Sequence, residues 1–160
     1  MEVAPRVAIR EFRGHRGAVS RVRFSASGHF LVSSSADCTV RLWNATRDSV
    51  GRDGRVGGHE VHCFGDSHAQ AVLDVVSSED GSFLASCGVD RLVVVSDVEK
   101  GGVRWRYRGH RDAVTSVLVS NSGRGVVSGS RDGSVCVWDL RARERGYVQR
   151  MRGFEDGIGS

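Results

Sequence analysis

The sequence predicts an all-β fold made of three consecutive sheets of short antiparallel strands, followed by the start of a fourth. Three observations predict it. One residue pattern recurs three times without a gap when His15, His68 and His110 are aligned. Within each copy, apolar residues alternate with small or polar ones, as in strands that bury one face. Glycines stand between the apolar runs, where they mark hairpin turns.

The same residue types follow each aligned histidine at fixed distances. Valines open an apolar run four and seven residues after it, and a glycine follows at thirteen. Serine and aspartate come at eighteen and twenty-two residues, and tryptophan at twenty-eight, although the second copy has Ser96 in the tryptophan position. The recurring polar and indole side chains are His15, Ser33, Asp37 and Trp43; His68, Ser86 and Asp90; and His110, Ser128, Asp132 and Trp138.

The alternation divides the chain into repeats and connecting segments. Each copy contains three strands, and a fourth is predicted at 102–108 and, in a shifted register, at 62–65. The repeats therefore cover 14–44, 67–97 and 109–139, and a fourth begins at 153–160. Eleven extra residues separate the first two histidines and fall within 47–60, a polar, glycine-rich segment. We expect a protruding loop there, because lengthening a surface loop costs little closure entropy.

Paired residues at the ends of the repeats resemble the signatures of the WD-repeat family: Gly14-His15, Gly109-His110, Trp43-Asn44 and Trp138-Asp139. The spacing of His68 and His110 also fits, since WD units are about 40 to 45 residues long. Ser67, Ser96 and Asn44 depart from the family pattern. The resemblance implies β-propeller blades, about three complete four-stranded ones plus the start of a fourth, in an incomplete propeller.

A finer resemblance is to the mitogen-activated protein kinase organizer family, seven-bladed WD scaffolds associated with kinase cascades and the spliceosome. The stretches that carry it are Val72-Leu73-Asp74, residues 90–95, residues 107–110 and Ser128-Gly129-Ser130. It covers the amino-terminal half of such a protein. Since propellers typically have four to eight blades, the remaining blades are expected from a longer chain or from another subunit.

The resemblance also implies a role for the recurring polar residues. In WD repeats the Trp indole donates to the Ser hydroxyl, the Ser reaches the His, and the Asp holds the His. Ser, His and Asp are also the parts of a hydrolase triad, but an enzyme needs one such site, whereas here the set recurs. No catalytic residue, metal or cofactor is therefore predicted. The second unit lacks the indole, so we expect it to be the least rigid, and Ser96→Trp to be neutral or stabilising.

A partner-binding rim follows from strand geometry if Val19, Val72 and Val114 are buried between blades. Their neighbours in the chain then face a central funnel, and the residue before each network aspartate joins them. The predicted rim residues are Ala18, Ser20, Ala36, Ala71, Leu73, Val89, Ala113, Thr115 and Arg131. Arg131 is the charged member, and its guanidinium suits an acidic or carboxylate-bearing partner.

Charge and composition leave one alternative open. The net charge is +4, and residues 141–152 contain Arg141, Arg143, Arg145, Arg150 and Arg152. The simpler interpretation is a solvated outer strand and its turn; the alternative is a contact with an acidic protein or with RNA through this arginine-rich segment. His59, His62, Cys63 and His68 could in principle bind zinc, but ordinary surface histidines are favoured.

These observations together predict a non-catalytic protein-protein interaction scaffold in a kinase-signalling or pre-mRNA splicing assembly. The expected partners are other proteins, namely kinase-cascade or spliceosomal components, with RNA as the alternative. The amino terminus has no signal-peptide pattern, and the chain has no run of 18 apolar residues. We therefore expect an intracellular protein, cytoplasmic or nuclear, with no membrane contact.

Overall fold

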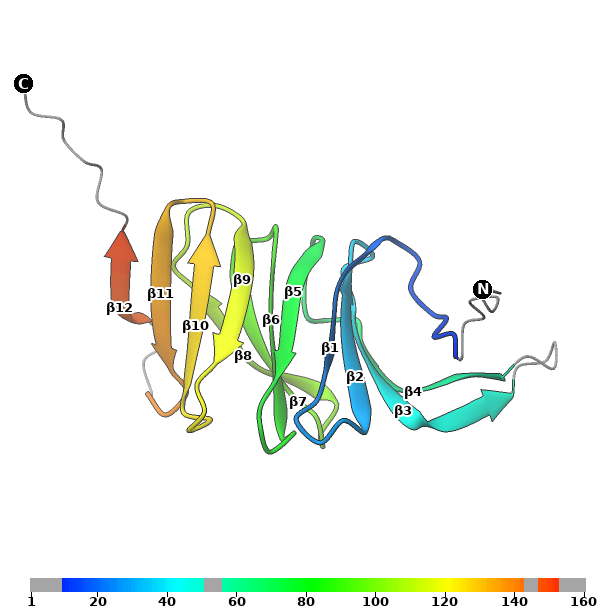
Figure 1. Cartoon of the computed structure of the whole chain (residues 1–160). Helices are drawn as coiled ribbons and strands as arrows, with labels where there is room; N and C mark the ends of the chain where they lie inside the picture. Colours follow the sequence, from blue (N-terminus) through cyan, green and yellow to red (C-terminus); the bar gives the residue numbers. More distant parts are fainter. Residues whose placement is uncertain (1–9, 51–55, 143–146, 153–160) are drawn as a thin grey trace, which may run out of the picture.

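The described chain is built from strands and turns. The computed structural model describes residues 10–50, 56–142 and 147–152. In these residues the strands form three four-stranded antiparallel sheets that stand in a row (Figure 1). The first contains β1 (Val19–Phe24), β2 (Phe30–Ser35), β3 (Val40–Val50) and β4 (Val56–Phe64). The second contains β5 (Val72–Ser77), β6 (Phe83–Gly88), β7 (Leu92–Asp97) and β8 (Gly102–Arg108). The third contains β9 (Val114–Val119), β10 (Gly125–Ser130), β11 (Ser134–Asp139) and β12 (Tyr147–Arg152).

This architecture confirms the predicted all-β repeat of four-stranded blades. Within each sheet the strands are hydrogen-bonded in chain order, so each blade is a simple meander. Strand β8 has the bounds predicted for the fourth strand of the second repeat. The predicted start of a fourth repeat, 153–160, lies outside the described residues.

Each blade has two distinct ends, which are named here for what they carry. The turn between the first two strands holds a glycine with positive φ: Gly28 at 72°, Gly81 at 71° and Gly123 at 65°. That left-handed conformation is open to glycine because it has no Cβ. We call this the glycine-turn end. The opposite end, which carries the aligned histidines and the turns with Asp37, Asp90 and Asp132, is the network end.

The core lies between the blades. One buried cluster joins Val32, Leu42 and Phe64 of the first blade to Val75 and Leu84 of the second. A second and larger cluster joins the second and third blades around the completely buried Trp138. Each fully buried valine, leucine or phenylalanine side chain in these clusters contributes about 1.5 to 3 kcal/mol to the stability of the fold. The alternation of apolar residues in the sequence thus stabilises the contact between blades.

One prediction about this packing is wrong for the first blade. Val72, Val75 and Val114 are 0% exposed, but the equivalent Val19 and Val22 of β1 are 49% and 55% exposed. The reason is that β5 packs against β1 and β2, and β9 against β5 and β6, while no described blade precedes β1. The outer face of β1 is therefore an uncovered interblade surface.

The predicted loop at 47–60 is also corrected. Strands β3 and β4 extend as a two-stranded ribbon through most of it, with Ser49 paired to Gly57 and Val50 to Val56. Figure 1 shows this ribbon reaching away from the first sheet. Backbone pairing needs no apolar alternation, so a polar sequence can still form a hairpin.

Candidate functional site

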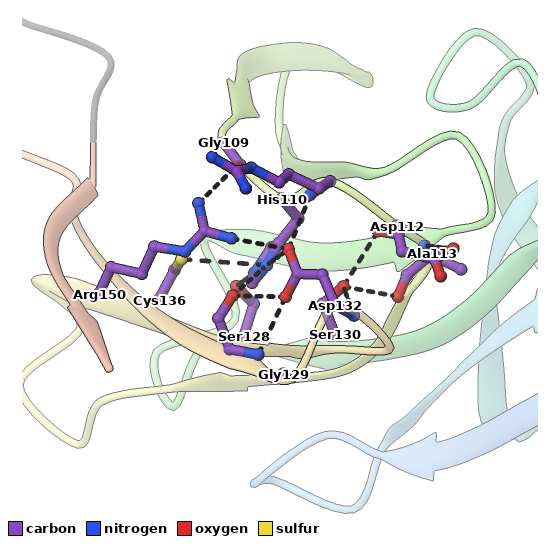
Figure 2. Close-up of polar contacts among 12 residues, drawn as sticks. Gly109, His110, Asp112, Ala113, Ser128, Gly129, Ser130, Asp132, Cys136 and Arg150 are labelled. Carbon is purple, nitrogen blue, oxygen red and sulfur yellow. Dashed lines mark hydrogen bonds and ion pairs between the residues drawn. The ribbon is translucent and has the colours of Figure 1, made fainter. Parts of the chain in front are cut away.

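The third blade shows the recurring polar residues in contact. Trp138 Nε1 donates to Ser128 Oγ over 2.8 Å, and Ser128 Oγ lies 2.8 Å from His110 Nε2. On the other side of the ring, His110 Nδ1 lies 3.3 Å from Asp132 Oδ2. Figure 2 shows His110, from the loop before β9, close to Ser128 of β10 and to Asp132 of the turn after it. The chain of contacts therefore ties two segments of the network end together.

The partners assign the protons along this chain. A carboxylate can only accept, so His110 Nδ1 carries the proton and Nε2 accepts from Ser128. Burial lowers the pKa of His110 and outweighs the opposite effect of the nearby Asp132, so the ring is neutral at neutral pH. Burial alone would raise the pKa of Asp132, but hydrogen bonds from Ser134 and from the Arg111 amide outweigh it and lower that pKa. The result is a neutral imidazole held by an ionised carboxylate.

The first blade repeats the arrangement. Trp43 Nε1 donates to Ser33 Oγ over 2.8 Å, and the same oxygen lies 2.7 Å from His15 Nε2. His15 Nδ1 lies 2.9 Å from Asp37 Oδ2. Burial raises the pKa of Asp37, but hydrogen bonds led by that from Thr39 outweigh it, so the carboxyl stays ionised.

The second blade keeps the His, Ser and Asp contacts without an indole. His68 Nδ1 lies 2.9 Å from Asp90 Oδ2, and His68 Nε2 lies 2.9 Å from Ser86 Oγ. In place of the indole, the buried Ser96 lies with its Oγ 3.5 Å from that of Ser67. The two residues that depart from the family pattern in this blade are therefore neighbours.

The shape of the first blade explains this pairing of departures. A Cβ on Gly14 would lie 2.6 Å from Arg41 Nη1, 2.8 Å from Glu60 Oε2 and 2.9 Å from the Trp43 ring, all closer than real Cβ atoms approach. Glycine therefore fits this position beside the tryptophan and the Arg41–Glu60 ion pair. Where Ser96 replaces tryptophan, the space that opens accommodates the side chain of Ser67.

Arg150 extends the network in the third blade, although the sequence did not assign it there. Its Nη2 lies 2.9 Å from Asp132 Oδ2, and its Nη1 donates to the Gly109 carbonyl over 3.2 Å. Figure 2 shows the guanidinium between these two groups. Arg106 on β8 makes a related bond to the Asp66 carbonyl, over 2.6 Å. An arginine on the outermost strand thus holds the loop before the histidine in two blades.

A second polar centre, which the sequence analysis did not predict, joins all three blades. Asp74 on β5 is 1% exposed. Arg21 Nε donates to its Oδ1 over 3.2 Å, and Arg23 Nη2 to both oxygens over 3.3 Å. From the third blade, the Val117 amide donates to Oδ2 over 3.1 Å. Arg21 and Asp74 occupy the same repeat position, six residues after His15 and His68. The opposite charges at this position in neighbouring repeats were the signal in the sequence for an ion pair between blades.

The predicted rim residues lie around the network end with different exposure. Ala18, Ser20, Ala36, Val89 and Arg131 are exposed, whereas Ala71, Leu73 and Thr115 are half-buried. Ala113 is buried, which corrects its place on an accessible rim. Its carbonyl accepts from the Arg131 amide over 3.0 Å and from Ser130 Oγ over 2.9 Å, which draws it inward.

The comparison with known proteins decides the family. The profile described as WD domain, G-beta repeat matches residues 6–44, 58–97 and 101–139. The chain belongs to the WD40 repeat family. Its three described sheets are thus WD40 blades of a β-propeller, and proteins of this family are generally non-catalytic interaction scaffolds.

Individual WD40 proteins are similar over most of the chain. The WD repeat domain-containing protein 83 homolog of Dictyostelium discoideum is 31% identical over 147 residues, covering 91% of this chain and 42% of the relative. Nuclear distribution protein PAC1 of Coccidioides posadasii is 31% identical over 162 residues, covering 83% of this chain and 32% of the relative. The chain therefore spans less than half the length of these relatives.

Solved structures of WD40 proteins are similar as well. The structure of U3-55K matches with a TM-score of 0.75 at 26% identity, covering 92% of this chain and 43% of the other. The RRP9 WD40 repeats match with a TM-score of 0.75 at 25% identity, covering 92% of this chain and 42% of the other.

The residues considered as zinc ligands have other positions in the WD40 blades. His68 belongs to the network of the second blade, and His62 Nε2 lies 2.9 Å from the carbonyl oxygen of Gly101. Among the described residues, no three His, Cys, Asp or Glu side chains gather as a metal site. The structure describes no helix with the length and apolar character needed to cross a membrane.

Proposed function

We propose that this WD40 chain is a non-catalytic scaffold that binds other proteins at its network end. The family acts generally through protein interactions. For the finer assignment, to an intracellular kinase-signalling or pre-mRNA splicing assembly, the support is the resemblance of residues 90–95 and 107–110 to the kinase organizer family.

The position of Arg131 carries the proposal. Its backbone is fixed at the network end by the bond from its amide to the Ala113 carbonyl. Its side chain is exposed, and in the described part of the chain no hydrogen bond or ion pair engages the guanidinium. Arg111, in the loop before β9, is also exposed. Its backbone is held next to this turn, because the Arg111 amide donates to Asp132, the residue after Arg131, over 2.7 Å. Two exposed arginines on adjoining segments are suited to a carboxylate-bearing partner.

The network itself supports a non-catalytic role. Ser33, Ser86 and Ser128 are buried, and each hydroxyl is already bonded to its histidine. A nucleophilic serine must reach a substrate, and these hydroxyls face the blade interior. The recurring residues therefore stabilise the blade ends and position the rim.

The alternative is RNA binding through residues 141–152, and the geometry weakens it. Arg150 is bound inside the blade, and Arg141 forms an ion pair of 2.9 Å with Asp139. Arg143 and Arg145 lie outside the described residues. With two of the five arginines already paired, fewer remain for phosphate contacts.

The test is affinity purification of the tagged chain from cells with quantitative mass spectrometry. We expect kinase-cascade or splicing components to be recovered, and Arg131→Glu to weaken binding of the principal partner by about 1.5 to 3 kcal/mol. Arg124→Glu, an exposed charge reversal at the glycine-turn end, is the matched control. Loss of the partner with Arg124→Glu alone would contradict the rim, and recovery that disappears after RNase treatment would favour the RNA alternative.

A further inference from the structure

A cavity at the glycine-turn end lies apart from the rim and the network. It opens between the first and second blades and has a volume of about 270 Å³. Leu42, Val61 and Leu84 are among its apolar lining, while Glu79 and Asp80 line it from the β5–β6 turn. Both walls belong to described blades, so the cavity does not depend on any further part of a propeller.

The size of the cavity selects the kind of occupant. An apolar cavity of roughly 150 Å³ already holds a benzene molecule, so this one accommodates a large apolar side chain. Pockets for drug-sized ligands and cofactors have roughly 300 to 1,000 Å³, so this cavity lies at the lower end of that range. Its size suits a single large apolar side chain of another protein.

The charge at the mouth of the cavity favours a basic residue next to the apolar side chain. Glu79 and Asp80 are both exposed. The hydrogen bond from Ser78 is the main cause that lowers the pKa of Asp80, with further bonds from Ser82, so its carboxylate is ionised at neutral pH. Asp80 also lines the neighbouring cavity, whereas Glu79 lines only this one of the two. No lysine or arginine lines this cavity, so the Glu79 carboxylate in particular can bind a basic residue.

The corresponding place between the second and third blades has the opposite character. A cavity of about 250 Å³ lies there, and Phe83 lines it where Phe30 lines the first. Its lining includes Arg104, Arg124 and Arg141 with a single carboxylate, Asp80, so basic residues predominate there. Two geometrically equivalent cavities of one chain thus differ in charge, which gives an internal comparison for selectivity.

We propose that the cavity between the first two blades is a docking site for a partner segment that inserts one large apolar side chain and places a lysine or arginine beside it. The apolar lining desolvates the anchor, and the two carboxylates bind the basic residue with charge-assisted hydrogen bonds. This site is separate from the rim, so the two surfaces can engage different partners.

The test uses a phage library of random heptapeptides panned against the full chain, with affinities then measured by fluorescence polarisation. We expect enriched peptides that carry an apolar residue with a lysine or arginine next to it. Val61→Trp places a bulky ring at the cavity and Glu79→Lys reverses the charge of its mouth, and each should weaken binding about tenfold or more, equivalent to about 1.4 kcal/mol. Val61 is 45% exposed, so the first change is not expected to unfold the blade.

The controls repeat both changes away from the cavity. Val135→Trp is a similar enlargement of a partly exposed strand residue, and Asp66→Lys reverses an exposed charge at the network end. Both should leave peptide affinity unchanged, as should the rim variant Arg131→Glu. Three outcomes would overturn the proposal: no enriched peptide, enrichment of acidic peptides, or binding that survives both Val61→Trp and Glu79→Lys. Failure of the rim proposal would leave these results unaffected.

Discussion

At the scale of single residues, the departures from the repeat pattern are coupled through space. Ser67 and Ser96 are 29 positions apart, yet their hydroxyl oxygens lie 3.5 Å apart in a buried region. In the first blade the same two positions hold Gly14 and Trp43, and the Trp43 ring is one of three groups that leave no room for a Cβ on Gly14. The sequence showed each departure but could not show that one accommodates the other, since that depends on the position of the indole ring.

This coupling reverses the expectation drawn from the sequence for Ser96→Trp. Because Ser67 occupies the space that the ring would need, we expect the single change to destabilise the chain by about 1 to 3 kcal/mol, as overpacking does. The double variant Ser67→Gly with Ser96→Trp should recover most of this loss. Chemical denaturation of the three variants measures the coupling. Equal stability of the single and double variants would contradict the steric explanation.

The buried His110 should make stability depend on pH. The pKa of His110 in the folded chain is lowered by burial, so the unfolded chain binds a proton at a higher pH than the folded one. Stability contributed by the neutral ring is therefore present above the unfolded value of 6.5 and is lost as the pH falls below it. Denaturant midpoints measured between neutral pH and mildly acidic pH should decline, and His110→Gln should flatten that decline. A midpoint that rises on acidification would contradict the assignment.

At the scale of elements, the strands were predictable and their extensions were not. The first strands β1, β5 and β9 begin at the valines that follow each histidine, because the apolar alternation typical of a strand starts there. The ribbon formed by β3 and β4 has no such alternation, so its polar sequence predicted a loop. Arg150 escaped prediction for a related reason: its partner Asp132 lies in another turn of the blade, and its own segment looked like a solvated strand.

The turn between the second and third strands has the same backbone conformation in all three blades but holds a different residue in each. One residue after each network aspartate, φ is positive: 69° at Cys38, 66° at Arg91 and 74° at Gly133. The left-handed region costs a residue with a Cβ about 1 to 2 kcal/mol, which exceeds the entropic cost of glycine. Arg91→Gly should therefore stabilise the chain by about 0.5 kcal/mol, and Gly133→Ala should destabilise it by about 1 kcal/mol. Thermal unfolding of both variants checks the pair, and shifts of the same sign would exclude backbone strain as the cause.

At the scale of the whole molecule, apolar and ionic contacts between blades hold the described chain together. Asp74 accepts hydrogen bonds from the first and third blades, and the two buried clusters fill the interfaces on either side of the second blade. A buried carboxylate without these donors would be costly, so the arrangement favours one alignment of the three blades. The sequence predicted apolar packing between blades, but the partners of Asp74 follow from which strands become neighbours in space.

The exposed face of β1 leads to a prediction about what lies beyond the described blades. Val22 and Val75 occupy the same repeat position, yet their exposed fractions are 55% and 0%. In a chain whose β1 face is uncovered, Val75→Ala should cost about 2 kcal/mol through lost burial and a residual cavity. Val22→Ala should cost less than about 0.5 kcal/mol, as surface changes do. Denaturation of both variants in the 160-residue chain gives the comparison. A cost for Val22→Ala that approaches that of Val75→Ala and grows with protein concentration would mean instead that a second copy covers β1, because the deeper burial would then come from a blade on another chain.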